Sequence, residues 1–207
     1  MIAETSQQIA RETNGQKKWT YDEIAALPDD KLRELHDGVP ILMPSPTPRH
    51  QELYLRLLLF IQHWIDGGGS GLIYPQPVDL KIDNYRTLIP DLLYYATNDR
   101  SAVVSENGKY LRAVPDLVVE IISPSSQNTD RFYKFDVYAE IGVNYYWTID
   151  PEFWIFQAFR LVDGKYQFEA SLSDEGEFAP ELFVGLKIPM AELFGPRPTA
   201  ATPEDEE

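Results

Sequence analysis

Three charged side chains in the middle of the sequence have types and spacing that suit phosphoester chemistry. Asp91 opens one strand candidate, Glu120 lies inside a later one, and Lys134 lies on the helix expected after it. Two carboxylates offer the hard oxygen ligands that Mg²⁺ or Mn²⁺ prefers, and such an ion activates water and stabilises charge on a phosphate. A lysine ammonium can orient that water or stabilise the same charge. The set predicts metal-assisted hydrolysis of a phosphodiester.

The stretch PDLVVEIISPSS, residues 115–126, gives a second reason to expect positive charge nearby. Alternation along a strand places Asp116 and Glu120 on one face together with Val118 and Ile122. A buried ionised carboxylate is unfavourable unless a cation or hydrogen bonds compensate it. We therefore expect a divalent ion and Lys134 beside this face, with Asp116 as a further metal ligand.

Ordinary structural roles for the same residues stay open. Glu120 could pair with a helix cation, and Lys134 could pair with Asp130, four residues earlier, on a solvated helix face. Asp91 and Asp116 each follow a proline, where aspartate is common in turns. Only the tertiary arrangement can separate these roles from a shared site.

Local signals predict the elements that must position these residues. A capping-box spacing at 20–23 predicts a short helix, and Asp37-Gly38 predicts a hairpin turn between residues 31–36 and 39–44. Apolar residues at helical spacing predict a long helix from Pro48 to about Ile65. Strand candidates follow at 72–82, 88–96 and 114–123, with a short helix possible in the linker from residue 97. A helix then runs to about Glu140, is stopped by Gly142, and precedes two or three aromatic-rich strands.

Composition and length indicate one folded domain. The chain has 207 residues, 43% hydrophobic and 25% charged, which is typical of a globular protein. We expect a mobile N-terminal segment at 1–18, a single domain at 19–195 and an acidic, Pro-rich disordered tail at 196–207. Without an apolar run of membrane-spanning length or a secretory signal, the expected location is cytoplasmic.

The net charge of −15 restricts how the protein could bind a polyanion. Nucleic acid is held mainly by Lys and Arg, so the overall electrostatic field of this chain opposes binding. Contacts would have to be concentrated near the site, with Arg49, Arg112 and Arg131 as candidates. We expect weak, metal-dependent binding.

The order of several motifs resembles the Uma-two family of restriction-endonuclease-like proteins. The motifs are ELHDG, SPTPRH, IPD, VPDLVVEIISPSS and DRFYKFDVYAEIGVNYYWTIDP, and the resemblance covers roughly residues 19–190, with the block 115–151 the most specific part. This family is assigned to the PD-(D/E)XK nuclease superfamily. The resemblance implies an α/β restriction-endonuclease-like fold with a central mixed sheet flanked by helices, an N-terminal hairpin, and metal-dependent cleavage of nucleic acid, with DNA as the expected polymer.

The resemblance also assigns roles to individual residues. Asp91 in IPD matches the first catalytic acid, and Glu120 matches the acid of the (D/E)XK element. The sequence departs from the plain motif because Ile122 stands where that motif has lysine; Lys134 resembles a lysine displaced to the helix. His50 in SPTPRH and Glu34 in ELHDG match further family positions that would border the site.

The sequence thus predicts a Mg²⁺- or Mn²⁺-dependent endonuclease, and two other functions stay open. One is a nuclease-fold protein that does not cleave and serves as a binding or assembly module; the acidic composition and the missing in-motif lysine favour it. The other is a hydrolase of small phosphate esters. A homodimer with two active sites is an expectation by analogy with restriction enzymes.

Overall fold

A mixed sheet carries the residues of interest. The computed structural model describes residues 17–28, 31–122 and 129–197, and within them the largest sheet has six strands in the order β10-β9-β8-β7-β6-β3. They are β3 (Leu72–Pro75), β6 (Leu92–Tyr95), β7 (Leu117–Ile121), β8 (Tyr145–Asp150), β9 (Ile155–Val162) and β10 (Lys165–Leu172). The β7–β8 pair is parallel and the other neighbours are antiparallel. The expected mixed sheet is confirmed.

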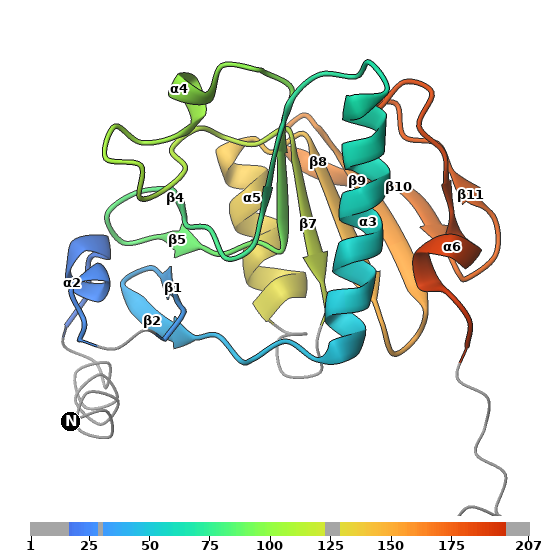
Figure 1. The fold of residues 1–207 in the computed structure, drawn as a ribbon. Helices are drawn as coiled ribbons and strands as arrows, with labels where there is room; N and C mark the ends of the chain where they lie inside the picture. The colour runs from blue at the N-terminus through green and yellow to red at the C-terminus, as the bar shows by residue number, and fades with distance from the viewer. Residues whose placement is uncertain (1–16, 29–30, 123–128, 198–207) are drawn as a thin grey trace, which may run out of the picture.

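Helices cover both faces of this sheet (Figure 1). Helix α3 (Pro48–Asp66) packs on one face, where its Leu53 and Leu57 join Val119 in one apolar cluster. The π-helical segment η1 (Thr129–Lys134) and helix α5 (Phe135–Ile141) cross over between the parallel strands β7 and β8, and Tyr138 of α5 joins Val118 in a second cluster. Strand β7 is therefore buried on both faces, and its alternating side chains meet different helices.

A second, smaller sheet brings the N-terminal hairpin against the first. Its strand order is β2-β1-β5-β4, with β1 (Arg33–His36), β2 (Val39–Leu42), β4 (Leu80–Lys81) and β5 (Thr87–Leu88). The predicted turn is present, with Asp37 at φ 51° and Gly38 at φ 90°. The predicted capping box is also present, because Thr20 and Glu23 bond reciprocally at the start of α2 (Tyr21–Ala25).

Two strand predictions were too long. Residues 72–82 divide into β3 of the large sheet and β4 of the small one, and residues 88–96 divide into β5 and β6 in the same way. Prolines stand at each break, at Pro75 and Pro77 and at Pro90. A proline has no N–H to donate to a strand ladder, so the chain leaves one sheet there and enters the other. This exchange places β1 beside β5, four residues before β6 begins.

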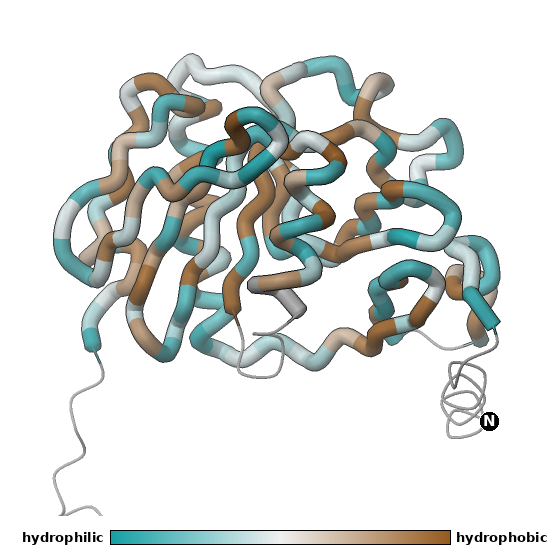
Figure 2. Tube along the Cα trace, turned by 180° about the vertical axis from the view of Figure 1, so that it is seen from behind, coloured by the Kyte–Doolittle hydropathy of each residue, from teal (hydrophilic) through white to brown (hydrophobic). Residues whose placement is uncertain are grey.

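The remaining elements belong to neither of these two sheets. They are α4 (Arg100–Val103), the short helix expected in the linker, β11 (Glu177–Phe178), β12 (Ile188–Pro189) and α6 (Met190–Phe194). Figure 2 shows hydrophobic residues concentrated along the central strands and hydrophilic ones in the connecting loops. No helix in the described part of the chain is long and apolar enough to cross a membrane. Most of the two terminal segments expected to be mobile, residues 1–16 and 198–207, lies outside the described residues.

Candidate active site

The two acids predicted from the sequence occupy neighbouring positions on adjacent strands. Strand β6 pairs antiparallel with β7 through Leu92 opposite Val119, and the same register continued by one residue places Asp91 opposite Glu120. Directly opposed residues on one face of such a pair have Cβ atoms about 4.5–5.5 Å apart. Both side chains are buried, with Asp91 6% and Glu120 3% exposed. The extended register thus places two acids that are 29 positions apart in the sequence opposite each other.

Asp91 is held by the backbone of the next strand and by the long helix. Its Oδ2 accepts a hydrogen bond of 2.6 Å from the backbone N–H of Ile121, and its Oδ1 lies 3.0 Å from Nε2 of His50. His50 stands in the first turn of α3, where its backbone N–H donates to the Thr47 side chain that caps the helix. The sequence expectation that His50 borders the site agrees with this contact.

Glu120 projects from β7 toward the crossover helix. Its Oε1 accepts hydrogen bonds from Nζ of Lys134 at 3.0 Å and from the hydroxyl of Tyr138 at 2.7 Å. Lys134 is the last residue of η1 and Tyr138 lies one helical turn later in α5. Strand alternation had placed Glu120 on the same face as Val118, and that face is the one covered by this helix.

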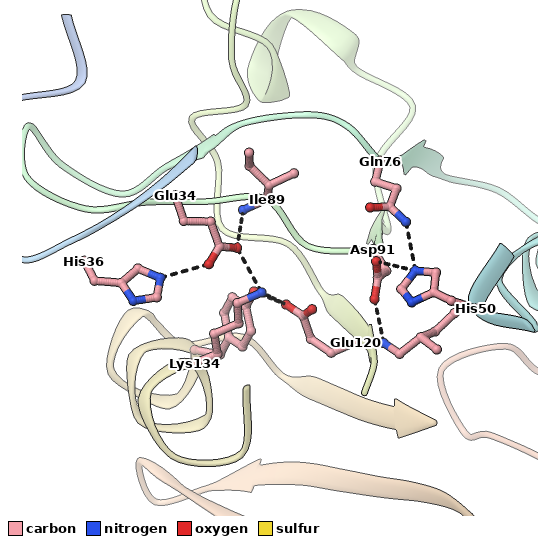
Figure 3. Close-up of polar contacts among 10 residues, drawn as sticks. Glu34, His36, His50, Gln76, Ile89, Asp91, Glu120 and Lys134 are labelled. Carbon is pink, nitrogen blue, oxygen red and sulfur yellow. Dashed lines mark hydrogen bonds and ion pairs between the residues drawn. The ribbon is translucent and has the colours of Figure 1, made fainter. Parts of the chain in front are cut away.

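Lys134 is deeply buried between two carboxylates from different sheets (Figure 3). Its Nζ lies 2.9 Å from Oε1 of Glu34 and 3.0 Å from Oε1 of Glu120, and its side chain is 1% exposed. A lysine on a solvated helix face is therefore the wrong description of this residue. Lys134 therefore contacts Glu120, the acid with which the sequence resemblance grouped it.

Glu34 connects the lysine to the N-terminal hairpin. Its Oε1 accepts a 2.9 Å hydrogen bond from the backbone N–H of Ile89, and its Oε2 lies 2.8 Å from Nε2 of His36. Since a carboxylate only accepts, the His36 ring nitrogen must donate. Glu34 is 1% exposed, so strand β1 contributes a buried anion to the same cluster.

The electrostatics of the cluster follow from burial and pairing. Burial raises the pKa of the Glu34 carboxyl. The charge of Lys134 and the hydrogen bonds to Glu34 together outweigh this effect, so the pKa lies below its ordinary value. Burial, and then the negative charges of Glu120 and Glu34, raise the pKa of Tyr138 well above its ordinary value. Tyr138 therefore remains a hydroxyl donor to Glu120 at neutral pH.

Formal charges leave the cluster negative. Glu34, Asp91 and Glu120 contribute three negative charges and Lys134 contributes one positive charge, so the balance with neutral imidazoles is two negative charges. A divalent cation would neutralise that balance. Mg²⁺ commonly uses one or two carboxylates and completes its shell with water and substrate phosphates, so Asp91 and Glu120 fit such an ion. Among the described residues, no three His, Cys, Asp or Glu side chains form a ready metal cluster.

The structure does not bring Asp116 to this cluster. Asp116 precedes β7, four residues from Glu120, which is about 13 Å at the rise of a strand. Its Oδ2 instead accepts a 2.7 Å hydrogen bond from the backbone N–H of Ala96. The turn-capping role that the sequence left open is the one that Asp116 has. The prediction that Asp116 is a third ligand on the same face was wrong because sharing a face does not imply proximity along the strand.

The three predicted nucleic-acid contacts have different surroundings. Arg49 lies in the first turn of α3 beside His50, and its guanidinium stacks over the Trp154 ring at 4.4 Å. Arg112 precedes β7, at the end of the strand remote from Glu120, and donates to the backbone oxygen of Ser101. The side chain of Arg131 lies outside the described residues. Proximity to the site therefore supports Arg49 and does not support Arg112.

Sequence reasoning missed three residues of the site. Tyr138 bonds Glu120, His36 bonds Glu34, and the Gln76 side-chain nitrogen lies 3.0 Å from Nε2 of His50. The spacing of Tyr138, four residues after Lys134, could have indicated the first. Alternation along β1 could have indicated His36 beside Glu34. No local pattern could have indicated Gln76, because it lies beside His50 only where the chain passes from the large sheet to the small one.

Comparisons with known proteins identify the family and a similar fold. The sequence model of the family Uma2, described as "Putative restriction endonuclease", matches residues 20–191. The fold is similar to the crystal structure of "a putative nuclease belonging to DUF820" from Anabaena variabilis, with a TM-score of 0.68 and 20% identity over 84% of this chain and 97% of that chain. Among curated proteins, none matches the sequence. Because the family match spans most of the chain, the protein belongs to the Uma2 family.

Proposed function

We propose that this protein is a divalent-metal-dependent nuclease that hydrolyses phosphodiester bonds, with Asp91 and Glu120 as metal ligands and Lys134 as the assisting cation. The observation that carries the proposal is the position of Lys134. A buried ammonium contacts Glu120, and Glu120 stands opposite a second buried acid in the strand register. A salt bridge needed only for stability would not require a second buried acid opposite Glu120 in the strand register. Family membership supports the same reaction class.

Each residue has a separate part in this proposal. When bound, Mg²⁺ or Mn²⁺ would activate a water molecule and stabilise charge on the phosphate. Asp91 presents one oxygen to the site, because the Ile121 amide fixes the other oxygen. Glu120 is held in position by hydrogen bonds from Lys134 and Tyr138. Lys134 adds a fixed positive charge where negative charge develops in the transition state.

The proposed substrate is nucleic acid, with DNA expected first, and the binding is expected to be weak. The net charge of −15 opposes a polyanion, so a bound metal ion and local cations such as Arg49 must supply the attraction. A complex that is tight in EDTA and persists at high salt would contradict this part of the proposal.

A second candidate function is a binding or assembly module that does not cleave. The contacts of Lys134 favour it, because an ammonium that already bonds two buried carboxylates can serve stability alone. Such a module would bind metal or nucleic acid without turnover.

An activity panel with matched variants tests the proposal. Purified protein is incubated with single- and double-stranded DNA and RNA, and with a chromogenic phosphodiester, in Mg²⁺, Mn²⁺ or EDTA. Cleavage should require metal and should fall at least about a hundredfold in Asp91→Asn and Glu120→Gln. Asp116→Asn is the control, since it alters an acid outside the site and retains an oxygen acceptor for Ala96.

The pattern of results separates the candidate functions. Turnover of the small diester without cleavage of any polymer would indicate a phosphate-ester hydrolase. Metal binding with no turnover of any substrate would indicate the module. Equal loss of activity in Asp116→Asn would show that the assays report folding rather than this site.

A further inference from the structure

One ring nitrogen of His50 has two neighbours that require opposite hydrogen-bonding roles from it, donor to one and acceptor from the other (Figure 3). Nε2 lies 3.0 Å from Oδ1 of Asp91 and 3.0 Å from the side-chain nitrogen of Gln76. A carboxylate oxygen only accepts a hydrogen bond, and an amide nitrogen only donates one. A ring nitrogen either donates or accepts, so it cannot satisfy both neighbours. With the Gln76 amide in this orientation, no placement of the hydrogen on Nε2 satisfies both the carboxylate oxygen and the amide nitrogen.

A half-turn of the Gln76 amide exchanges its oxygen and nitrogen positions and removes one part of this conflict. Two acceptor oxygens, from Asp91 and Gln76, would then face one ring nitrogen that has at most one hydrogen. The three atoms are a carboxylate oxygen, an amide oxygen and an imidazole nitrogen, and each is a common metal ligand. The Asp91 oxygen and the Gln76 side-chain atom each lie 3.0 Å from the imidazole nitrogen.

The spacing of these atoms suits one coordination shell. In an octahedral shell with metal–ligand distances of about 2.1 Å, neighbouring ligand atoms lie about 3.0 Å apart. Both distances from His50 Nε2 are 3.0 Å. The two distances from the imidazole nitrogen therefore match those between neighbouring ligand atoms of such a shell.

The surrounding backbone holds these groups in place. The Ile121 amide occupies Oδ2 of Asp91 and leaves Oδ1 for the site. The Thr47 cap fixes the turn that carries His50, and the backbone N–H of Gln76 donates to the backbone oxygen of Asp91 at 3.0 Å. His50 is 8% exposed, so an ion there would be largely shielded from bulk water. Such preorganisation is typical of metal ligands and their supporting hydrogen bonds.

We infer that His50 and Gln76 are ligands of the same divalent ion as Asp91, and that the imidazole makes this a site for Mn²⁺ or a similar transition metal rather than for Mg²⁺. This inference rests on the proposed function, because it specifies the ion for the same reaction. Imidazole nitrogen suits transition metals, whereas Mg²⁺ prefers oxygen ligands and retains water. Glu120, which bonds Lys134 and Tyr138, would then be a further ligand of an ion held mainly by the other three groups.

Binding and spectroscopy test the inference without relying on activity. Calorimetry measures Mn²⁺ and Mg²⁺ affinity after EDTA treatment, and pulsed electron paramagnetic resonance of bound Mn²⁺ detects nitrogen coupling from a directly bound imidazole. Wild type should bind Mn²⁺ more tightly than Mg²⁺ and show that coupling. His50→Gln should lose the coupling and at least about tenfold in Mn²⁺ affinity, with a smaller change for Mg²⁺. Gln76→Leu should also weaken Mn²⁺ binding but retain the coupling.

Matched controls are available on the same helix. His63→Gln changes an exposed histidine about 20 Å further along α3, and Gln62→Leu changes a glutamine that bonds Asp66 instead. Both should retain wild-type affinity and coupling. If His50→Gln does not fold, as judged by circular dichroism, the wild-type spectrum decides by itself, because absence of nitrogen coupling there overturns the inference.

The remaining outcomes distinguish this inference from the proposed function. If wild type binds Mn²⁺ and Asp91→Asn weakens it, but His50→Gln binds equally well, His50 is not a ligand and the nuclease proposal stands. If wild type binds no divalent ion at all, both fail. If Mg²⁺ binds as tightly as Mn²⁺ in wild type, the assignment of a transition metal is wrong.

Discussion

The ammonium of Lys134 and the carboxylate of Glu34 form an ion pair of 2.9 Å in which both side chains are 1% exposed. The pair joins the crossover helix of the large sheet to strand β1 of the small sheet. The N-terminal hairpin is therefore part of the candidate active site and does more than cover it. Changes in the hairpin should affect the residues that Lys134 contacts.

Replacing Lys134 should destabilise the protein strongly. Lys134→Met would leave two carboxylates, Glu34 and Glu120, buried without their cation. Breaking a buried pair in this way costs about 3–5 kcal/mol. Urea denaturation monitored by tryptophan fluorescence measures the free energy of unfolding. Lys187→Met, at an exposed pair with Glu177, is the control and should change it little.

A small effect of Lys134→Met would show that the two acids find other partners. Because Lys134→Met is expected to lose stability, a loss of its activity can be assigned to catalysis only when its stability is measured as well. Adding Glu34→Gln to Lys134→Met removes one of the two uncompensated charges and should recover part of the lost stability.

The stability of the protein should fall in acid, and Glu34 should account for part of the loss. Although Glu34 is buried, the charge of Lys134 and the hydrogen bonds that Glu34 accepts hold the pKa of Glu34 below the ordinary value of 4.5. As pH falls, the unfolded chain therefore binds the proton first. The stabilisation is present above pH 4.5 and is lost as pH falls through the lowered pKa of the folded state.

Urea denaturation at a series of pH values from 7 to about 3 measures this dependence. Glu34→Gln should be less stable at pH 7, and its stability should decline less as pH falls. Glu106→Gln, at an exposed position, should retain the wild-type slope. A slope unchanged in Glu34→Gln would mean that Glu34 does not titrate in this range.

The turn of the hairpin should tolerate only glycine at position 38. Gly38 has φ 90°, and a Cβ there would lie 2.7 Å from Cβ of Lys18. A left-handed conformation costs a residue with a Cβ about 1–2 kcal/mol, and the clash adds to that. Gly164→Ala, in the β9–β10 turn at φ 74° with nothing within 4 Å, is the control for conformation alone.

Gly38→Ala should lower the free energy of unfolding by more than Gly164→Ala does, in the same urea assay. Because the turn sets the register of β1, which carries Glu34, Gly38→Ala should also weaken the lysine cluster. Equal losses in the two variants would show that Lys18 moves aside without penalty.

The sequence by itself determined the features that depend on neighbouring residues. The Thr20 capping box, the Asp37-Gly38 turn, the helix from Pro48 and the Gly142 helix stop all come from interactions within a few residues. Alternation along β7 also determined which face holds Glu120, because side chains point to opposite faces with a fixed period. The proposed roles of Asp91, Glu120 and Lys134 came from their residue types and spacing and from motif resemblance.

Only the tertiary structure decided which of these residues meet. Prolines at 75, 77 and 90 divide two apparent strands between two sheets, and that division places Gln76 at His50 and Glu34 at Lys134. Contacts across such distances depend on sheet order and strand register, which a local pattern does not encode. The burial of Lys134 follows from these long-range pairings. Asp116 is a carboxylate, and strand alternation places it on the same face as Glu120. Its distance of four residues along the strand nevertheless separates it from the site, and it bonds the backbone of Ala96 instead.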